Sequence, residues 1–235
     1  MGPFAKHSIN SNIPDEKKSV KYSSVGDAIQ KILSLPLNSY TAKTDISDAF
    51  CLFPIKPSEY PKLGMKFRGK YYYDRNLPQG CGSSCQIFEV FSTAIQAIFE
   101  HYVPDARCVH MMDDYFIIAT NYTTCNNHLQ KLLQICQDIG VPMAPDKTTS
   151  PSLQTTFLGI KLDTHLQVAR LPRDKIEEYA NEVEATLSRR KIKKKELESL
   201  IGKLNFAASV VPARPFLRRL INMLKTVDNP TTTCV

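Results

Sequence analysis

The spacing of apolar positions changes along the chain, and each change marks a predicted element. Apolar residues recur three and four positions apart in three segments, which predicts helices at 25–33, 84–101 and 124–139. Alternating or continuous β-prone runs predict strands at 40–46, 63–67, 70–74, 107–112 and 116–119. Ser24 is a suitable N-cap for the first helix, with Asp27 three residues later. Arg68-Gly69 and Asp113-Asp114 separate neighbouring strands and so predict two hairpins.

The last third of the chain changes from strands to helices. Residues 156–163 and 166–169 predict a third hairpin. Helical spacing follows, and it predicts helices at 173–189, 194–208 and 215–224. The middle of the chain therefore reads strand, helix, hairpin, helix, strand, which is typical of an antiparallel α+β layer. We expect the polar residues 1–24 to be loosely ordered and residues 226–235 to form a disordered tail.

Composition restricts the class of protein. A chain of 235 residues suits one large domain or two small ones, and a hydrophobic fraction of 43% suffices for a core. No apolar run reaches membrane-spanning length, so we expect no membrane partner. The seven cysteines are odd in number and scattered, which favours reduced thiols in an intracellular protein, cytoplasmic or nuclear.

The excess positive charge is confined to one segment. The formal net charge is +7, and residues 170–225 alone hold fourteen Lys or Arg and seven Asp or Glu. The rest of the chain is neutral. A basic segment in a chain that also carries clustered acids favours a polyanionic partner, with nucleic acid as the first candidate.

Three aspartates are candidates for catalysis. Asp113 and Asp114 occupy the predicted turn between two apolar strands. Neighbouring carboxylates repel each other, so such a turn is costly unless cations or water absorb the charge. The pair alone is consistent with a solvated hairpin turn. Asp45, at the end of an earlier strand, favours a catalytic interpretation, because three carboxylates from two strands can hold two divalent ions.

A loop rich in Gly and Ser, residues 77–84, precedes the helix predicted at 84–101. Gly80 and Gly82 allow the backbone to approach a ligand closely, and the helix N-terminus that follows favours a phosphate group. An ordinary start of a helix is the alternative interpretation.

Several short motifs, taken together, resemble the palm motifs of reverse transcriptases in order and spacing. They are Asp45 with Phe50, Leu77-Pro78-Gln79-Gly80, Met111-Met112-Asp113-Asp114, Lys147 and the Phe157-Leu158-Gly159 hairpin. Residues 77–89 resemble the version in retrotransposons that carry a tyrosine recombinase, the DIRS and Ngaro type. Residues 200–207 and 214–220 point to the same type. The resemblance covers about residues 20–225.

The resemblance implies an α+β fold of the right-hand polymerase type. In this fold a palm, an antiparallel sheet with helices packed on one face, is followed by an α-helical thumb. We expect the palm at 25–170, with a small fingers hairpin at about 60–76, and a basic thumb or connection at 171–225. Family members carry a longer fingers region, so residues 1–24 are expected to be a truncated remnant of it. No segment resembles an RNase H domain, and RNase H or recombinase segments would belong to a parent polyprotein.

The resemblance also implies catalytic roles. Asp45, Asp113 and Asp114 would bind two Mg²⁺ ions, with Mn²⁺ as an alternative, for transfer of a nucleotide from a dNTP to a primer. The backbone carbonyl of Ile46 would complete the coordination. Lys147 would protonate the leaving pyrophosphate, and a solvated surface lysine is the alternative for this residue.

Substrate-binding residues follow from the same resemblance. Phe50 would place its ring against the sugar 2′ position and exclude ribonucleotides, which argues against an RNA-dependent RNA polymerase. A core aromatic is the alternative for Phe50. Gln79 and Gly80 would line the nascent base pair and the template strand. Met111, where the family usually has Tyr, and Met112 would contact the substrate near the primer terminus.

Two further groups are expected to contact nucleic acid. The primer grip would be the segment Phe157–Val168, with Phe157, Leu158 and Gly159 as nucleic-acid-binding residues. The thumb would contact the duplex backbone through the basic side chains Arg189, Arg190, Lys191, Lys193, Lys194 and Lys195. A solvated helix face is the alternative for this basic run, because Glu196 and Glu198 follow it. Asp48 is expected to be structural.

The function we expect is RNA-directed DNA polymerase activity, a nucleotidyltransferase reaction on an RNA or DNA template with a primer. The alternative is a weak or inactive nucleic-acid-binding remnant of a mobile-element polymerase. The intact acids favour the enzyme, and the short fingers region favours the remnant.

Overall fold

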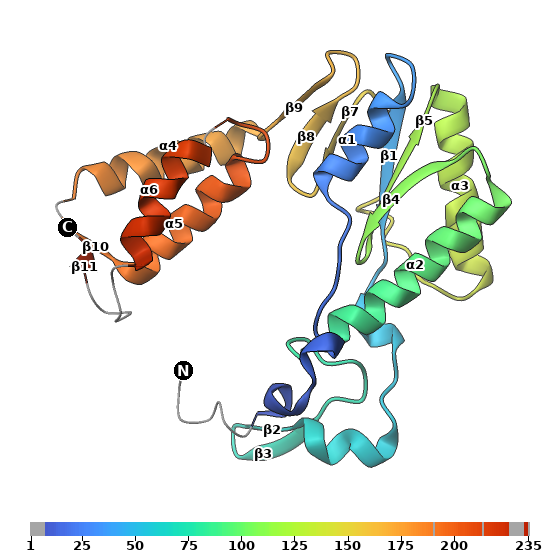
Figure 1. Cartoon of the computed structure of the whole chain (residues 1–235). Helices are drawn as coiled ribbons and strands as arrows, with labels where there is room; N and C mark the ends of the chain where they lie inside the picture. The colour runs from blue at the N-terminus through green and yellow to red at the C-terminus, as the bar shows by residue number, and fades with distance from the viewer. Residues whose placement is uncertain (1–7, 190, 213, 226–232, 235) are drawn as a thin grey trace. The chain divides into compact units, whose positions relative to one another are not determined.

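The structure is a computed structural model that describes residues 8–189, 191–212, 214–225 and 233–234 (Figure 1). The chain divides into two compact units, residues 1–155 and 156–235. The division falls before the hairpin at 156–170 that we expected in the palm.

Six α-helices are described, each within two residues of its predicted ends. They are α1 (Val25–Leu33), α2 (Ser84–Tyr102) and α3 (Tyr122–Asp138) in the first unit, and α4 (Arg173–Leu187), α5 (Lys194–Ala207) and α6 (Arg214–Lys225) in the second. Short 3₁₀ helices lie at Ile9–Asn12, Asp15–Lys17, Ala49–Leu52 and Pro57–Leu63. Ser24 caps α1 as predicted, because its hydroxyl accepts from the amide of Asp27 and the Asp27 carboxylate accepts from the amide of Ser24.

The first unit is built on a four-stranded antiparallel sheet with the order β4-β5-β1-β6. The strands are β4 (Arg107–Met111), β5 (Asp114–Ala119), β1 (Tyr40–Asp45) and β6 (Thr149–Ser152). The fourth strand, β6, was not predicted, because its polar residues and Pro151 carry no strand pattern. It forms through pairing with β1, where Thr41 lies opposite Ser152.

Helices α2 and α3 pack on one face of this sheet, as the expected palm requires. Their core side chains contact alternate residues of β5, Tyr115 and Ile117, which are fully buried. Phe116 and Ile118, which point to the other face, are equally buried, and α1 contacts β4 and β5. The sheet is therefore covered on both faces along β5, and its polar chemistry is confined to strand ends.

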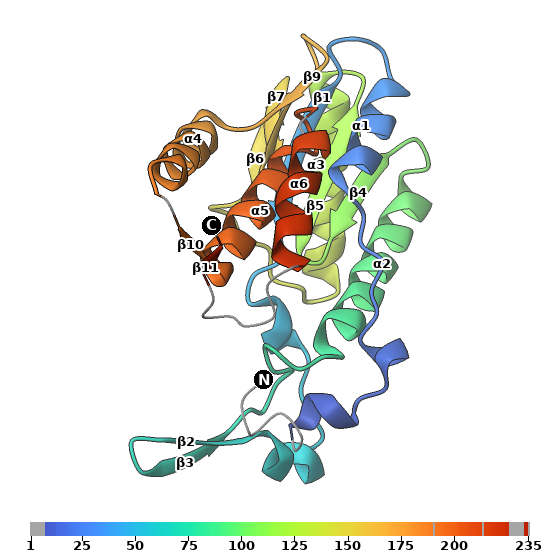
Figure 2. The ribbon, with the colours of Figure 1, turned by 60° about the vertical axis from the view of Figure 1, so that its left-hand side comes forward.

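A separate two-stranded hairpin extends from the first unit (Figure 2). It consists of β2 (Gly64–Phe67) and β3 (Lys70–Tyr73), joined at Arg68 and Gly69 as predicted. Both turn residues have positive φ, 47° and 78°, which matches the twist of paired strands. Every residue of the two strands is exposed.

The polar segment at residues 8–24, expected to be loosely ordered, is hydrogen bonded to the Gly-rich loop. The side-chain amide of Asn10 donates to the carbonyl of Gly80 at 2.8 Å, and its oxygen accepts from the amide of Gly82 at 2.7 Å. Gln86 at the start of α2 donates to backbone carbonyls of the same segment. The N-terminal segment is therefore hydrogen bonded both to the loop between the hairpin and α2 and to the start of α2.

The second unit joins a small sheet to the three C-terminal helices. The sheet contains β7 (Gln154–Phe157), which starts in the first unit, β8 (Ile160–Asp163) and β9 (Val168–Arg170). We expected one strand over residues 156–163, and this was wrong: Leu158 and Gly159, with φ of 47° and 76°, form a tight turn within it. Lys175 of α4 (Arg173–Leu187) lies close against this turn, because a Cβ built on Gly159 would be 3.0 Å from its ammonium nitrogen.

Helices α5 and α6 share an apolar core. Ile192, Leu197 and Ile201 are buried there, against Leu220 and Leu224. A short strand β10 (Ile192–Lys193) pairs with β11 (Thr233–Cys234), the only described part of the expected tail. None of the helices in the described ranges combines the length and apolar character that a bilayer crossing needs.

Candidate active site

The three predicted acids meet where β1 ends and β5 begins. The two strands are antiparallel neighbours, so the last residue of β1 faces the first residue of β5, and Asp45 is the direct partner of Asp114. The amide of Ile46 donates to the carbonyl of Asp113 at 3.1 Å, which fixes the turn to the end of β1. This register agrees with the prediction that two strands bring the three acids together.

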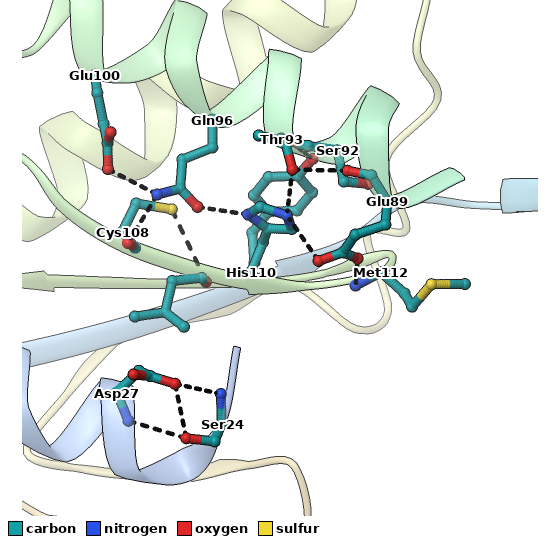
Figure 3. A network of polar contacts seen from close by, with 12 residues as sticks. Ser24, Asp27, Glu89, Ser92, Thr93, Gln96, Glu100, Cys108, His110 and Met112 are labelled. Carbon is teal, nitrogen blue, oxygen red and sulfur yellow. Dashed lines mark hydrogen bonds and ion pairs between the residues drawn. The ribbon is translucent and has the colours of Figure 1, made fainter. Parts of the chain in front are cut away.

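The turn itself differs by one residue from the prediction. Met112 and Asp113 form the two-residue turn, and Asp114 is already the first residue of β5. Met112 has a φ of 56°, a conformation that is strained for an unbranched apolar residue. The carboxylate of Glu89, on α2, accepts from the amide of Met112 at 3.0 Å (Figure 3).

Burial and mutual repulsion both act on these acids. Asp45 is only 5% exposed, and the ammonium of Lys147 donates to its Oδ1 at 2.9 Å. Burial, and then the charge of Asp45, raise the pKa of Asp114 to about 6. Burial also raises the pKa of Asp113, and Asp45 adds to that shift. Hydrogen bonding to Asp45 raises the pKa of Lys147.

The donor set fits a hard divalent cation. Asp45, Asp113 and Asp114 offer carboxylate oxygens, which Mg²⁺ prefers, and the pKa values of Asp113 and Asp114 are raised by burial and by the charge of Asp45, both of which a bound cation would offset. Within the described residues, no three His, Cys, Asp or Glu side chains lie close enough together to hold a metal ion. At Asp45, the ammonium of Lys147 supplies the positive charge that a bound metal ion would otherwise provide.

The predicted substrate-binding residues lie in the same unit. Phe50 is half-buried, and its ring centroid lies 5.5 Å from that of Phe88, a contact compatible with either of its interpretations. Gln79 and Gly80 are exposed, and Gly80 has a φ of 85° that only glycine adopts readily. A cavity of about 280 Å³ lies against them, lined also by the N-terminal segment and the base of the β2–β3 hairpin. Asp48 is exposed and begins a 3₁₀ helix.

The predicted nucleic-acid-binding residues lie in the second unit. Phe157 is 1% exposed, so its side chain belongs to the interior, and a contact of this residue with nucleic acid would have to use its backbone. Its place in the primer grip stays a prediction. Leu158 and Gly159 form the neighbouring turn and are partly exposed. Most of the basic thumb side chains are exposed: Arg189, Lys191, Lys193 and Lys195. Lys194 is half-buried, and Arg190 lies outside the described residues.

A polar network that was not predicted from the sequence reaches the turn at Met112 (Figure 3). Glu89 is 8% exposed and faces Nε2 of His110, which is 5% exposed, at 3.4 Å. The signal was a polar stripe on α2, at Glu89, Thr93, Gln96 and Glu100, which recurs every three or four residues beside the apolar stripe. Such a stripe normally faces solvent, so the sequence alone does not distinguish a buried polar network from an exposed helix face.

Comparison with known proteins agrees with this geometry. Residues 7–162 match the family model described as reverse transcriptase (RNA-dependent DNA polymerase). Protein P of duck hepatitis B virus (strain Germany/DHBV-3) is 27% identical over 197 residues, which cover 81% of this chain and 23% of that protein. The Gag-Pol polyprotein of woolly monkey sarcoma virus is 26% identical over 134 residues, 54% of this chain and 8% of the polyprotein. The chain thus spans less than a quarter of these relatives.

Solved structures share the fold. A foamy viral protease-reverse transcriptase in complex with double-stranded DNA superposes with a TM-score of 0.68 at 21% identity, over 91% of this chain and 35% of the other. The same enzyme in complex with an RNA/DNA hybrid superposes with a TM-score of 0.68 at 20% identity, over 91% of this chain and 27% of the other. These likenesses support the polymerase fold expected from the sequence. With two thirds of its length matched by the family model, the chain belongs to the reverse transcriptase (RNA-dependent DNA polymerase) family.

Proposed function

We propose that this chain is an RNA-directed DNA polymerase that extends a primer on an RNA or DNA template with dNTPs. The observation that carries the proposal is the direct pairing of Asp45 with Asp114, next to Asp113, at one end of the sheet. Such a carboxylate group suits nucleotidyl transfer, because it can bind the cations that the reaction's phosphates require. Bound to these three residues, two Mg²⁺ or Mn²⁺ ions would supply charge neutralisation at the triphosphate and activation of the primer hydroxyl.

The chain's own residues would perform the remaining tasks. Phe50 would limit space at the sugar, since its ring is half-exposed next to the core. Gln79 and Gly80 would contact the template base pair beside the cavity that they line. Met111 and Met112, both half-buried, would support the substrate at the primer terminus. Lys147, with a pKa raised by Asp45, would hold its proton until the leaving pyrophosphate develops negative charge.

The β2–β3 hairpin suits contact with single-stranded template. Phe67 and Tyr71 are 59% and 79% exposed, and Lys66, Arg68 and Lys70 stand between or beside them. No acidic residue occurs from position 64 to position 73. Exposed aromatic rings offer stacking platforms for bases, and the cations attract phosphates. The basic side chains of the second unit would add contacts to a duplex backbone.

We place the chain within a mobile element, since residues 77–89 resemble the DIRS and Ngaro type of retrotransposon. RNase H or recombinase segments would then be encoded on the same polyprotein. We also propose an intracellular location, cytoplasmic or nuclear, from the scattered cysteines; six are described, and none of these forms a disulfide.

One observation favours a second candidate, a nucleic-acid-binding protein without polymerase activity. The ammonium of Lys147 already neutralises Asp45, at a distance of 2.9 Å. A chain that had lost catalysis could keep this ion pair and still bind nucleic acid through its basic and aromatic surfaces.

Primer extension distinguishes the two candidates. Wild-type protein, the Asp113→Asn/Asp114→Asn variant and the control Asp48→Asn, an exposed acid near the site, are given primed RNA, dNTPs and Mg²⁺ or Mn²⁺. Extension by wild type and Asp48→Asn but not by the double variant supports the polymerase. Binding of primer–template by all three proteins without extension supports the second candidate.

A further inference from the structure

We propose that Glu89, held in place by His110, is a positioning residue that fixes the backbone of the Met112–Asp113 turn and so the catalytic acids. The inference rests on the proposed function. It assigns a role to a buried acid that is not among the residues expected to contact the substrate. Its basis is the 3.0 Å hydrogen bond from the amide of Met112 to Oε2 of Glu89 (Figure 3).

The turn needs external support. It has two residues, and Met112 adopts a φ of 56° at which side chains other than glycine are strained. The carboxylates of Asp113, within the turn, and Asp114, directly after it, repel each other when ionised. The bond from Glu89 satisfies the amide of the strained residue and connects the turn to α2, a helix of 19 residues packed on the sheet.

Glu89 itself is fixed by the groups around it. Gln96 donates its amide hydrogens to Glu100 at 2.8 Å and to the carbonyl of Cys108 at 3.2 Å. Its oxygen must therefore face Nδ1 of His110, 2.5 Å away, and Nδ1 carries a hydrogen. This assignment leaves Nε2 of His110 to interact with Glu89.

His110 lies directly beside Glu89. Nε2 of His110 is 3.4 Å from Oε1 of Glu89, and the other oxygen, Oε2, accepts from the amide of Met112. The imidazole also stacks on Tyr115, with ring centroids 5.7 Å apart, which limits its motion.

The charged groups that face this pair come from two helices, α1 and α2. Glu100 on α2 acts on His110 through Gln96, and Lys31 of α1 donates to the carbonyl of Cys108 at 2.6 Å. Thr93 lies 3.5 Å from Nε2 of His110. Together these contacts form a continuous chain from Glu100 through Gln96, His110 and Glu89 to the amide of Met112. Within this chain, Glu89 alone touches the turn.

Three variants of Glu89 separate positioning from folding. Glu89→Gln keeps an oxygen for Met112 and offers an amide hydrogen to Nε2 of His110, so it should complete the same network. Glu89→Met keeps the shape but removes the acceptor. Glu89→Asp keeps the charge but is one methylene too short to reach the turn. Glu100→Gln, at the far end of the same network, is the control.

The first measurement is kinetic. We expect kcat for dNTP incorporation to fall about 10- to 100-fold in Glu89→Met and Glu89→Asp, as is typical when a residue that orients catalytic groups is lost. The KM for dNTP and the affinity for primer–template should change less than threefold. Glu89→Gln and Glu100→Gln should stay within about threefold of wild type. Wild-type kcat in Glu89→Asp would overturn the proposal, even if Glu89→Met does not fold.

The second measurement does not require activity. Hydrogen–deuterium exchange of a peptide containing residues 107–116 reports protection of the Met112 amide. Wild type and Glu89→Gln should be equally protected, and Glu89→Asp should exchange about tenfold faster at this amide. Equal protection in all three would overturn the proposal. If Glu89→Asp loses protection but the wild type has no polymerase activity, the proposed function is rejected and the positioning role of Glu89 is supported.

Discussion

The ammonium of Lys147 lies 2.9 Å from Oδ1 of Asp45, so the most buried of the three acids is paired with a lysine in the protein alone. Asp45 would therefore have to release this partner, or share it, when a metal ion binds. Because the side chain of Lys147 is 56% exposed, the pair is easily rearranged. The lysine is then free to face the leaving group.

Replacing Lys147 should affect metal binding and turnover in opposite directions. Lys147→Gln removes a competitor for Asp45, so Mn²⁺ affinity of the free protein should rise about fivefold. Polymerase kcat should fall about 100-fold if the lysine donates a proton. Lys147→Arg keeps the positive charge and should leave Mn²⁺ affinity unchanged. Electron paramagnetic resonance titration and single-turnover kinetics measure the two effects, and unchanged kcat in Lys147→Gln would exclude the proton-donor role.

Asp114 should make the metal-free protein less stable as pH rises. Its folded pKa of about 6 exceeds the unfolded value of 3.8, so the folded state binds more protons between these values. Stability therefore decreases as pH rises through this range, and the loss is complete above pH 6. Asp114→Asn should stabilise the protein at pH 8 by about 1 kcal/mol, discounted for the solvent at this half-exposed carboxyl, and hardly at pH 4. Thermal melting at both pH values, in the presence of a chelator, checks this. Equal effects at both values would contradict it.

Phe50 should control the choice of sugar. Phe50→Val should raise the efficiency of ribonucleotide relative to deoxyribonucleotide incorporation about 10- to 100-fold. Phe53→Leu is the control, because Phe53 packs on the same ring of Phe88, at 5.7 Å, without a predicted sugar contact. If Phe50 is only a core aromatic, both variants should melt earlier, and neither should change the sugar preference.

The β2–β3 hairpin should bind the unpaired template. Phe67→Ala/Tyr71→Ala should weaken binding of a primer–template with a single-stranded overhang about tenfold or more, because each base stacked on an aromatic ring contributes about 1–3 kcal/mol. Binding of a blunt duplex should not change. Tyr102→Ala removes a similarly exposed ring, 61% accessible, from the end of α2 and serves as the control. Fluorescence anisotropy measures all of these affinities, and equal losses for both nucleic acids would argue against a template contact.

The basic side chains of the second unit should give duplex binding a strong salt dependence. Lys191→Gln/Lys195→Gln should reduce the slope of log affinity against log salt concentration by about two, one for each lost phosphate contact. Lys131→Gln on α3 is the control. A wild-type affinity that does not respond to salt would remove the thumb assignment.

The sequence indicated most of the scaffold because its signals are local. Ser24, the turn at Arg68-Gly69 and the apolar stripes of the helices each depend on neighbours within a few residues. The strand β6 had no such signal, since Pro151 and its polar neighbours become a strand only against β1. The turn at Leu158 was hidden for a related reason, because a leucine with a φ of 47° does not look like a turn residue.

The acids could be predicted from the sequence, but the groups that hold them could not. Asp45, Asp113 and Asp114 stand at the ends of recognisable apolar strands, so their meeting point follows from antiparallel pairing. Glu89 resembles any solvated helix residue until the register of α2 against β4 places His110 beside it. The burial of the Phe157 side chain was likewise not evident from the motif, which gives a position in the chain and not an exposure.

The central position of β1 has a consequence for the order of events during protein synthesis. One neighbour, β5, comes from the middle of the first unit, and the other, β6, from its end, with Thr41 and Ser152 bonded across 111 residues of sequence. A ribosome must therefore release nearly the whole first unit before β1 can be enclosed and Asp45 can be held in its final place. The candidate active site is thus among the last features of this unit to be completed.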